Sequence, residues 1–141
     1  MHQSKKILLV LTLFSTAIAL SGCVPKLSGG GGGPKTEEFV SGKVVRGFPA
    51  SVPLYKNSQV VESYGGVSGW GASFITDDSL AKVVNFYNQS LSRLGWTVAP
   101  RQVDDTNYVF EIKNEKNIGK IIVNTAADGK KTAITMSIDQ R

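Results

Sequence analysis

Side chains that commonly carry catalysis are scarce in this chain. Its only cysteine is Cys23, and its only histidine, His2, lies at the extreme N-terminus. A cysteine thiolate is a strong nucleophile, and a cysteine with no second cysteine in its chain is open to intermolecular pairing or covalent modification. The other candidates are two pairs of adjacent carboxylates, Asp77-Asp78 and Asp104-Asp105. Paired carboxylates suit acid–base chemistry or the binding of a hard metal ion.

The residues before Cys23 have the pattern of a secretory signal. Residues 1–6 carry two lysines and no acid, and residues 7–20 are apolar apart from three hydroxyl side chains. A basic start followed by an apolar run of about 7–15 residues is typical of a signal peptide. The run is short for a bilayer span, which needs about 20 apolar residues. The pattern therefore predicts an extracytoplasmic protein that loses residues 1–22.

The end of this segment, Leu20-Ser21-Gly22-Cys23, resembles the lipobox of bacterial lipoproteins at all four positions. The resemblance implies that the Cys23 sulfur receives a diacylglycerol through a thioether and that the chain is then cut between Gly22 and Cys23. It also implies acylation of the freed amine, and two or three acyl chains anchor a protein stably, whereas one is marginal. An ordinary signal peptide or an uncleaved anchor is the alternative.

Val24 follows the lipobox cysteine. In enterobacterial lipoproteins an Asp at this position favours retention at the inner membrane. The resemblance therefore implies a membrane-anchored protein, at the outer membrane if the source has two membranes.

A glycine-rich segment separates Cys23 from the rest of the chain. Five consecutive glycines, Gly29 to Gly33, precede Pro34. Glycine loses more backbone entropy on ordering than any other residue, so this segment is predicted to be a flexible linker with a reach of about 20 Å. A phosphate-binding loop is disfavoured because no strand precedes the glycines and no helix start follows. The predicted organisation is a signal peptide (1–22), a lipidated cysteine with its tether (23–35) and one folded domain (36–141).

The apolar pattern of residues 36–141 predicts an α+β domain. One amphipathic helix is expected at about residues 78–94, capped by Thr76 or Asp77 and ended by Gly95. Alternating patterns predict strands at 59–64, 72–76, 96–99, 108–113, 120–126 and 132–139, with Pro100 ending the strand at 96–99. Residues 37–48 fit either a short strand or a loop.

Short polar turns between the last four predicted strands favour an antiparallel meander. The predicted fold is therefore a two-layer sandwich with one helix packed on a mainly antiparallel sheet, in the order β-β-α-β-β-β-β. The residues Asn85-Phe86-Tyr87, Leu91, Leu94 and Gly95-Trp96 resemble an "FY…L…GW" signature of small, largely uncharacterised bacterial envelope domains. That resemblance implies the fold and no activity.

The charge of the chain does not indicate nucleic-acid binding. The full chain has a net charge of +5, and loss of Lys5 and Lys6 leaves 14 basic and 11 acidic residues, or +3. The remaining lysines gather at predicted turns, where they suit solvated hairpin ends or contact with anionic headgroups, and they form no basic stripe with interleaved aromatics. We therefore expect the membrane and an envelope protein or envelope component as partners, and no nucleic acid.

Three aromatic residues are the candidates for binding. Trp70 lies in the glycine-rich stretch 65–71, where it is either an anchor at the edge of the core or an exposed binding residue. Tyr64 and Trp96 pose the same choice. A large apolar pocket opening at the 65–71 loop would indicate a small or lipidic ligand, whereas an exposed flat patch or an open strand edge would indicate a protein partner.

Removal of residues 1–22 leaves no histidine, and lipidation of Cys23 leaves no free thiol. Histidine acid–base catalysis, cysteine nucleophiles and the usual zinc ligand sets are then excluded. Asp77-Asp78 is expected to stabilise the helix start and Asp104-Asp105 to solvate a turn, so no catalytic residue, metal or cofactor is expected beyond the covalent lipid. The favoured function is a lipid-anchored envelope lipoprotein with a non-catalytic binding or assembly domain. The alternatives are binding of a small or lipidic ligand near Trp70 and a carboxylate-dependent hydrolase.

Overall fold

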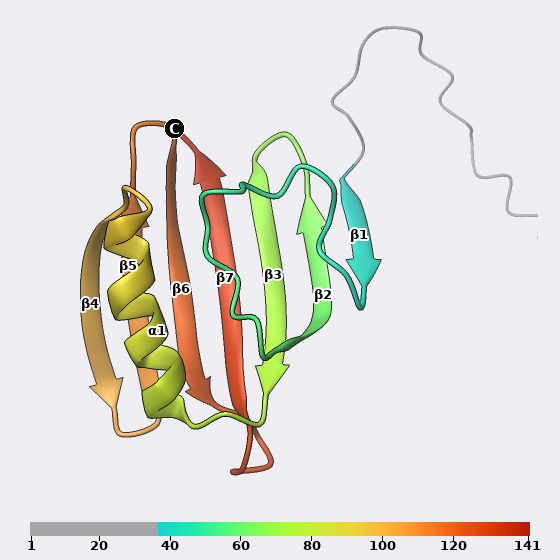
Figure 1. The fold of residues 1–141 in the computed structure, drawn as a ribbon. Helices are drawn as coiled ribbons and strands as arrows, with labels where there is room; N and C mark the ends of the chain where they lie inside the picture. The colour runs from blue at the N-terminus through green and yellow to red at the C-terminus, as the bar shows by residue number, and fades with distance from the viewer. Residues whose placement is uncertain (1–36) are drawn as a thin grey trace, which may run out of the picture. The chain divides into compact units, whose positions relative to one another are not determined.

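The computed structural model describes residues 37–141. The predicted signal peptide, its cleavage site at Gly22, Cys23, Val24 and the tether lie outside the described residues. Residues 37–141 contain seven strands and one helix, joined by turns and one long connection (Figure 1). The elements are β1 (Glu38–Ser41), β2 (Gln59–Gly65), β3 (Gly69–Thr76), α1 (Leu80–Arg93), β4 (Thr97–Asp104), β5 (Asn107–Lys113), β6 (Asn117–Thr125) and β7 (Thr132–Gln140). Within this part of the chain no helix has both the length and the apolar character needed to cross a bilayer.

The strands form one sheet in the order β1-β2-β3-β7-β6-β5-β4, and every neighbouring pair is antiparallel. Helix α1 covers one face of this sheet (Figure 1), so the predicted two-layer α+β sandwich is confirmed. The strands after the helix form the expected meander, and its last strand, β7, then pairs with β3. This pairing leaves β1 and β4 as the two edges of the sheet.

One detail of the strand prediction was incomplete, and another was wrong. The segment that fitted either a strand or a loop contains β1, so three strands rather than two precede the helix. Pro100 does not end its strand, because β4 continues to Asp104. An edge strand has a neighbour on one side only and therefore tolerates a residue without an amide hydrogen, which explains why the proline is accommodated there.

Ser79 is the N-cap of α1, and its hydroxyl accepts a hydrogen bond from the Lys82 amide at 3.4 Å. The expected caps, Thr76 and Asp77, were wrong by a few residues because Thr76 still belongs to β3 and pairs with Thr132. At the other end, Gly95 takes a φ of +85°, a left-handed conformation that favours glycine and ends the helix as predicted.

The apolar stripe of α1 packs against the sheet as its spacing of three and four residues predicted. The stripe buries Val83, Val84, Tyr87 and Leu91. The ring of Tyr87 lies 5.9 Å from that of Phe110, a fully buried residue of β5. The inward faces of the other strands complete the core with Ala72, Phe74, Ile112, Ile121, Val123, Ile134, Met136 and Ile138.

A long connection between β1 and β2, residues 42–58, shares the helix side of the sheet (Figure 1). It buries Val52 and Tyr55 in the same core. The Trp96 indole donates a hydrogen bond to the Ser51 carbonyl at 2.8 Å, and the Ser63 hydroxyl, on β2, is bonded to the backbone of Lys43 and Val45. These bonds attach the connection to the turn after α1 and to β2.

Candidate functional site: the hollow beside Trp70

Trp70 lies in β3 on the face of the sheet that carries the helix and the connection. Its side chain is half-buried and packs against the core. Its cross-strand partner is Gly65, and a Cβ at that position would come within 2.7 Å of the indole. Gly65 therefore leaves the space that the ring occupies, and Trp70 is both an anchor of the core edge and partly open to solvent.

A hollow of about 480 Å³ opens beside Trp70. Three segments that are distant in sequence meet there: the 42–58 connection, the turn before β6 and the end of β7. Besides Trp70, its lining residues are Gly47, Pro49, Glu115, Lys116, Asn117, Gln140 and Arg141. The indole offers an apolar surface, while the cationic and amide side chains offer hydrogen-bond donors. This combination suits a ligand with one apolar part and one polar part.

The structure does not bring the three candidate aromatics together. Trp96 is only 3% exposed and belongs to the core. Tyr64 is 46% exposed, and its ring covers Gly71, where a Cβ would overlap it. Because Tyr64 alternates with the inward-facing Ser63, it lies on the face of the sheet opposite Trp70.

A second hollow, of about 520 Å³, lies on the face of the sheet that α1 leaves open. It spans four strands, β4 to β7, and is lined by side chains that include Thr97, Glu111, Lys113, Ile118, Lys120 and Asp139. In sequence these residues alternate with core positions and have the pattern of an ordinary solvated face. Only the pairing of four strands gathers them, so sequence reasoning missed this hollow.

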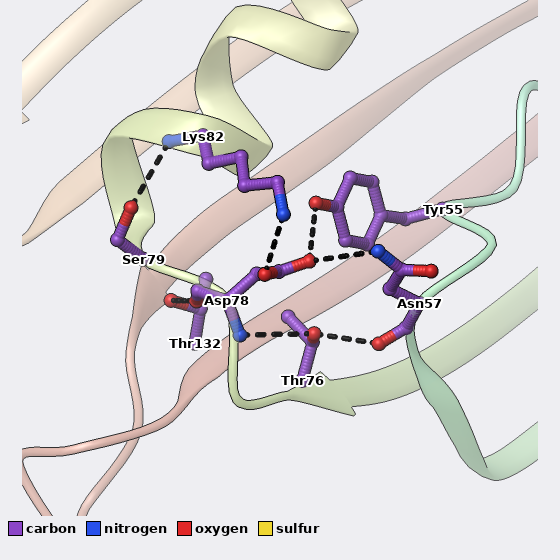
Figure 2. A network of polar contacts seen from close by, with 7 residues as sticks. All are labelled: Tyr55, Asn57, Thr76, Asp78, Ser79, Lys82 and Thr132. Carbon is purple, nitrogen blue, oxygen red and sulfur yellow. Dashed lines mark hydrogen bonds and ion pairs between the residues drawn. The ribbon is translucent and has the colours of Figure 1, made fainter.

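Asp78 is the centre of a polar network at the start of α1 (Figure 2). Its carboxylate accepts hydrogen bonds from the Tyr55 hydroxyl at 2.7 Å and from the Asn57 amide at 3.1 Å, and it forms an ion pair with Lys82 at 2.7 Å. Its carbonyl oxygen accepts from the Thr132 hydroxyl at 2.8 Å. The network therefore ties the 42–58 connection, the helix start and β7 to one another.

These contacts shift the titration of both partners. The Lys82 ammonium, followed by the Tyr55 and Asn57 donors, lowers the pKa of Asp78 to about 2. Burial, followed by the hydrogen bond to Asp78, raises the pKa of Tyr55 to about 12. Asp78 is thus held as an anion and Tyr55 as a neutral donor, which is the arrangement of a structural contact rather than of an acid–base pair.

We expect the Asp78 network to make folding sensitive to acid. The pKa of Asp78 is 3.8 when unperturbed and about 2 in the folded protein. Between these values the unfolded chain binds a proton that the folded chain does not, so stability should fall as the pH is lowered through this window. Thermal unfolding of the wild type and of Asp78→Asn over this range measures the effect. The variant should be less stable near neutral pH and should lose less stability on acidification, and parallel pH profiles would contradict this assignment.

The other candidate carboxylates do not converge with Asp78. Asp77 is exposed and lies 3.6 Å from Lys131. Asp104 accepts hydrogen bonds from the amide and hydroxyl of Thr106 in the β4–β5 turn, which lowers its pKa. Within residues 37–141 no group of three or more potential metal-ligating side chains comes together. Asp78 and Asp104 are therefore engaged in local structural contacts at the helix start and in the β4–β5 turn.

Ser79 and Lys82 have the Ser-x-x-Lys spacing that serine hydrolases such as β-lactamases use, with the serine at a helix start. Here the Ser79 hydroxyl caps the helix, and the Lys82 ammonium bonds Asp78. Lys82 therefore points to the Asp78 carboxylate rather than to the Ser79 hydroxyl, and both residues stabilise the start of the helix.

One helix packed on an antiparallel sheet, with a hollow at the end of the sheet, places the protein in the class of α+β helix-grip domains. Residues 56–135, more than half of the chain, match the family model described as START domain-like, and the chain belongs to that family. START-like domains are generally non-catalytic and bind ligands. No curated protein and no solved structure matches the chain significantly.

Proposed function

We propose that the protein is a lipid-anchored envelope lipoprotein whose START-like domain binds a small or lipidic ligand in the hollow beside Trp70. The single observation that carries the binding role is membership of a family of ligand-binding domains, across a segment that includes Trp70. The hollow falls in the size range of about 300–1,000 Å³ that is usual for small-molecule pockets.

The lining of the hollow supports a ligand of mixed polarity. The Trp70 indole would contact its apolar part, while Asn117, Gln140 and Lys116 would face its polar part. Arg141 is already engaged: its guanidinium donates to the Asn114 carbonyl at 3.2 Å and its amide to the Lys116 carbonyl at 2.9 Å. These two bonds hold the end of β7 against the turn before β6 and so shape one wall of the hollow.

Native mass spectrometry of the protein purified from its own membranes tests this role. We expect a non-covalent adduct on the wild type that is lost or strongly reduced in the double variant Lys116→Ala, Gln140→Ala. The matched control is the double variant Lys113→Ala, Lys120→Ala, whose side chains line the hollow on the open face. Loss of the adduct in the control variant alone would show that the ligand binds in the hollow on the open face instead. Absence of any adduct from the wild type would contradict the proposal.

Assembly with an envelope protein is the second candidate function. The observation that favours it is the outer edge of β1, a four-residue strand that, among residues 37–141, pairs with β2 alone. An added strand is a common way for a sheet edge to bind an extended peptide. Cross-linking of the membrane-bound protein, followed by identification of peptides joined to residues 38–41, distinguishes this function from ligand binding.

A further inference from the structure

Three exposed apolar side chains lie where the described chain begins: Phe39 in β1, Tyr64 in β2 and Val67 in the β2–β3 connection. We call them the entry patch. Their exposed fractions are 62%, 46% and 59%. Phe39 and Tyr64 are cross-strand partners, so their side chains lie on the same face of the sheet within about 5.5 Å of each other at Cβ.

Val67 follows Tyr64 by three residues, in the β2–β3 connection, which comes close to the first described residue, Glu37. A Cβ at Gly66 would lie 2.9 Å from the side chain of Glu37. The entry patch therefore lies near Glu37, where the described part of the chain begins. The β6–β7 connection, residues 126–131, lies at the opposite end, since Thr76 pairs with Thr132 whereas Gly69 pairs with Asp139.

The length of chain between this patch and the proposed anchor limits their separation. Thirteen residues, 24–36, lie between Cys23 and Glu37. A glycine-rich chain of that length has a root-mean-square span of about 20 Å. The inference that follows rests on the proposed lipid anchor at Cys23, which would hold the entry patch at about this average distance from the bilayer surface.

We propose that the entry patch inserts into the headgroup region of the bilayer that holds Cys23, and so fixes the orientation of the domain. Tyr64 suits this region because its ring is apolar while its hydroxyl can stay in water, and Phe39 and Val67 add apolar surface. Three exposed carboxylates, Glu37, Glu38 and Glu62, lie within two residues of Phe39 or Tyr64 along the chain. Negative charge is repelled by anionic headgroups, so the surface that fits is a zwitterionic one.

This orientation bears on the hollow beside Trp70. Trp70 pairs with Gly65 and Ile138, and Asn117 pairs with Gln140, so the hollow lies at the same end of the sheet as the β2–β3 connection. The hollow and the Phe39–Tyr64 pair therefore share one end of the sheet but lie on opposite faces of it, so insertion of the entry patch would leave the hollow uncovered by the bilayer.

An environment-sensitive fluorophore on Val67→Cys tests the inference in the full-length lipidated protein, bound to phosphatidylcholine vesicles. The Cys23 sulfur does not compete for the label because it is held in a thioether. We expect a blue shift and stronger emission on vesicle binding at position 67. The matched label, on Lys130→Cys in the β6–β7 connection, should stay solvent-exposed. A label on Ser68→Cys repeats the measurement should the Val67 variant fold poorly.

Substitution of the patch provides the second half of the test. Phe39→Ser should abolish the blue shift at position 67, whereas Val103→Ser, at an exposed apolar residue of β4, should preserve it. Vesicle flotation of the same samples measures separately whether the lipid anchor binds the protein to the vesicles. Flotation without a blue shift at position 67, or with equal shifts at both labels, overturns the entry-patch inference and leaves the anchor intact. Failure of the lipidated protein to float overturns the anchor and this inference with it.

Discussion

Replacement of Phe110 by alanine is expected to lower the free energy of unfolding by about 3–5 kcal/mol. Phe110 is fully buried between helix and sheet, its ring lies 5.9 Å from that of Tyr87, and its neighbours across the sheet are Pro100 and Ile121. Loss of the ring removes apolar contacts and leaves a cavity that the surrounding strands close only in part. Because small domains are stable by about 5–15 kcal/mol, this is a large share of the total.

Urea unfolding of the Phe110→Ala variant measures this effect. The matched control is Val103→Ala, at an exposed residue of β4, which should change stability by less than about 0.5 kcal/mol. A loss below about 1 kcal/mol at Phe110 would mean that the layer between α1 and the sheet is not the close-packed core described above.

The core layer was the part of the fold most open to prediction. Apolar residues alternate in β5 and β7 and recur every three or four positions in α1, and both patterns predict that one face of the element is buried. The structure buries Phe110, Ile134 and Leu91 as these patterns predict. The residue at which the helix starts was harder to predict from the sequence. Thr76, Asp77 and Ser79 are all acceptable caps, and Thr76 is excluded only by its pairing with Thr132 of β7.

The edges of the sheet were predicted least well, for a related reason. β1 is four residues long with exposed side chains and carries almost no burial pattern, so its strand conformation depends on pairing with β2. Pro100 ends a strand only where both sides of the strand are paired, and the sequence does not state that β4 is an edge.

The candidate site could be predicted only as single residues. Trp70 was identified because an aromatic residue in a glycine-rich stretch needs an explanation. The hollow beside it depends on residues 47–49, 115–117 and 140–141, which come together only when β7 pairs with both β3 and β6. The family match likewise depends on a pattern along some eighty residues rather than on one motif.

Replacement of Cys23 by serine is expected to abolish lipid attachment and to release or mislocalise the protein. A serine hydroxyl is a far weaker nucleophile than a thiolate and does not form the thioether that the lipobox resemblance implies. In that resemblance cleavage follows lipid attachment, so the variant should also keep residues 1–22. Metabolic labelling with a radioactive fatty acid, intact mass and membrane fractionation measure these three effects.

Two further variants make the Cys23 experiment specific. Ser28→Ala changes the tether without touching the lipobox and should leave labelling and fractionation unchanged. Val24→Asp should keep the lipid label but move the protein toward the inner membrane if the source has two membranes. Unchanged fractionation and undiminished label in Cys23→Ser would contradict the anchor. Loss of the label with the ligand adduct retained would show that anchoring and binding are separable, because Trp70 and its hollow lie wholly within the folded domain.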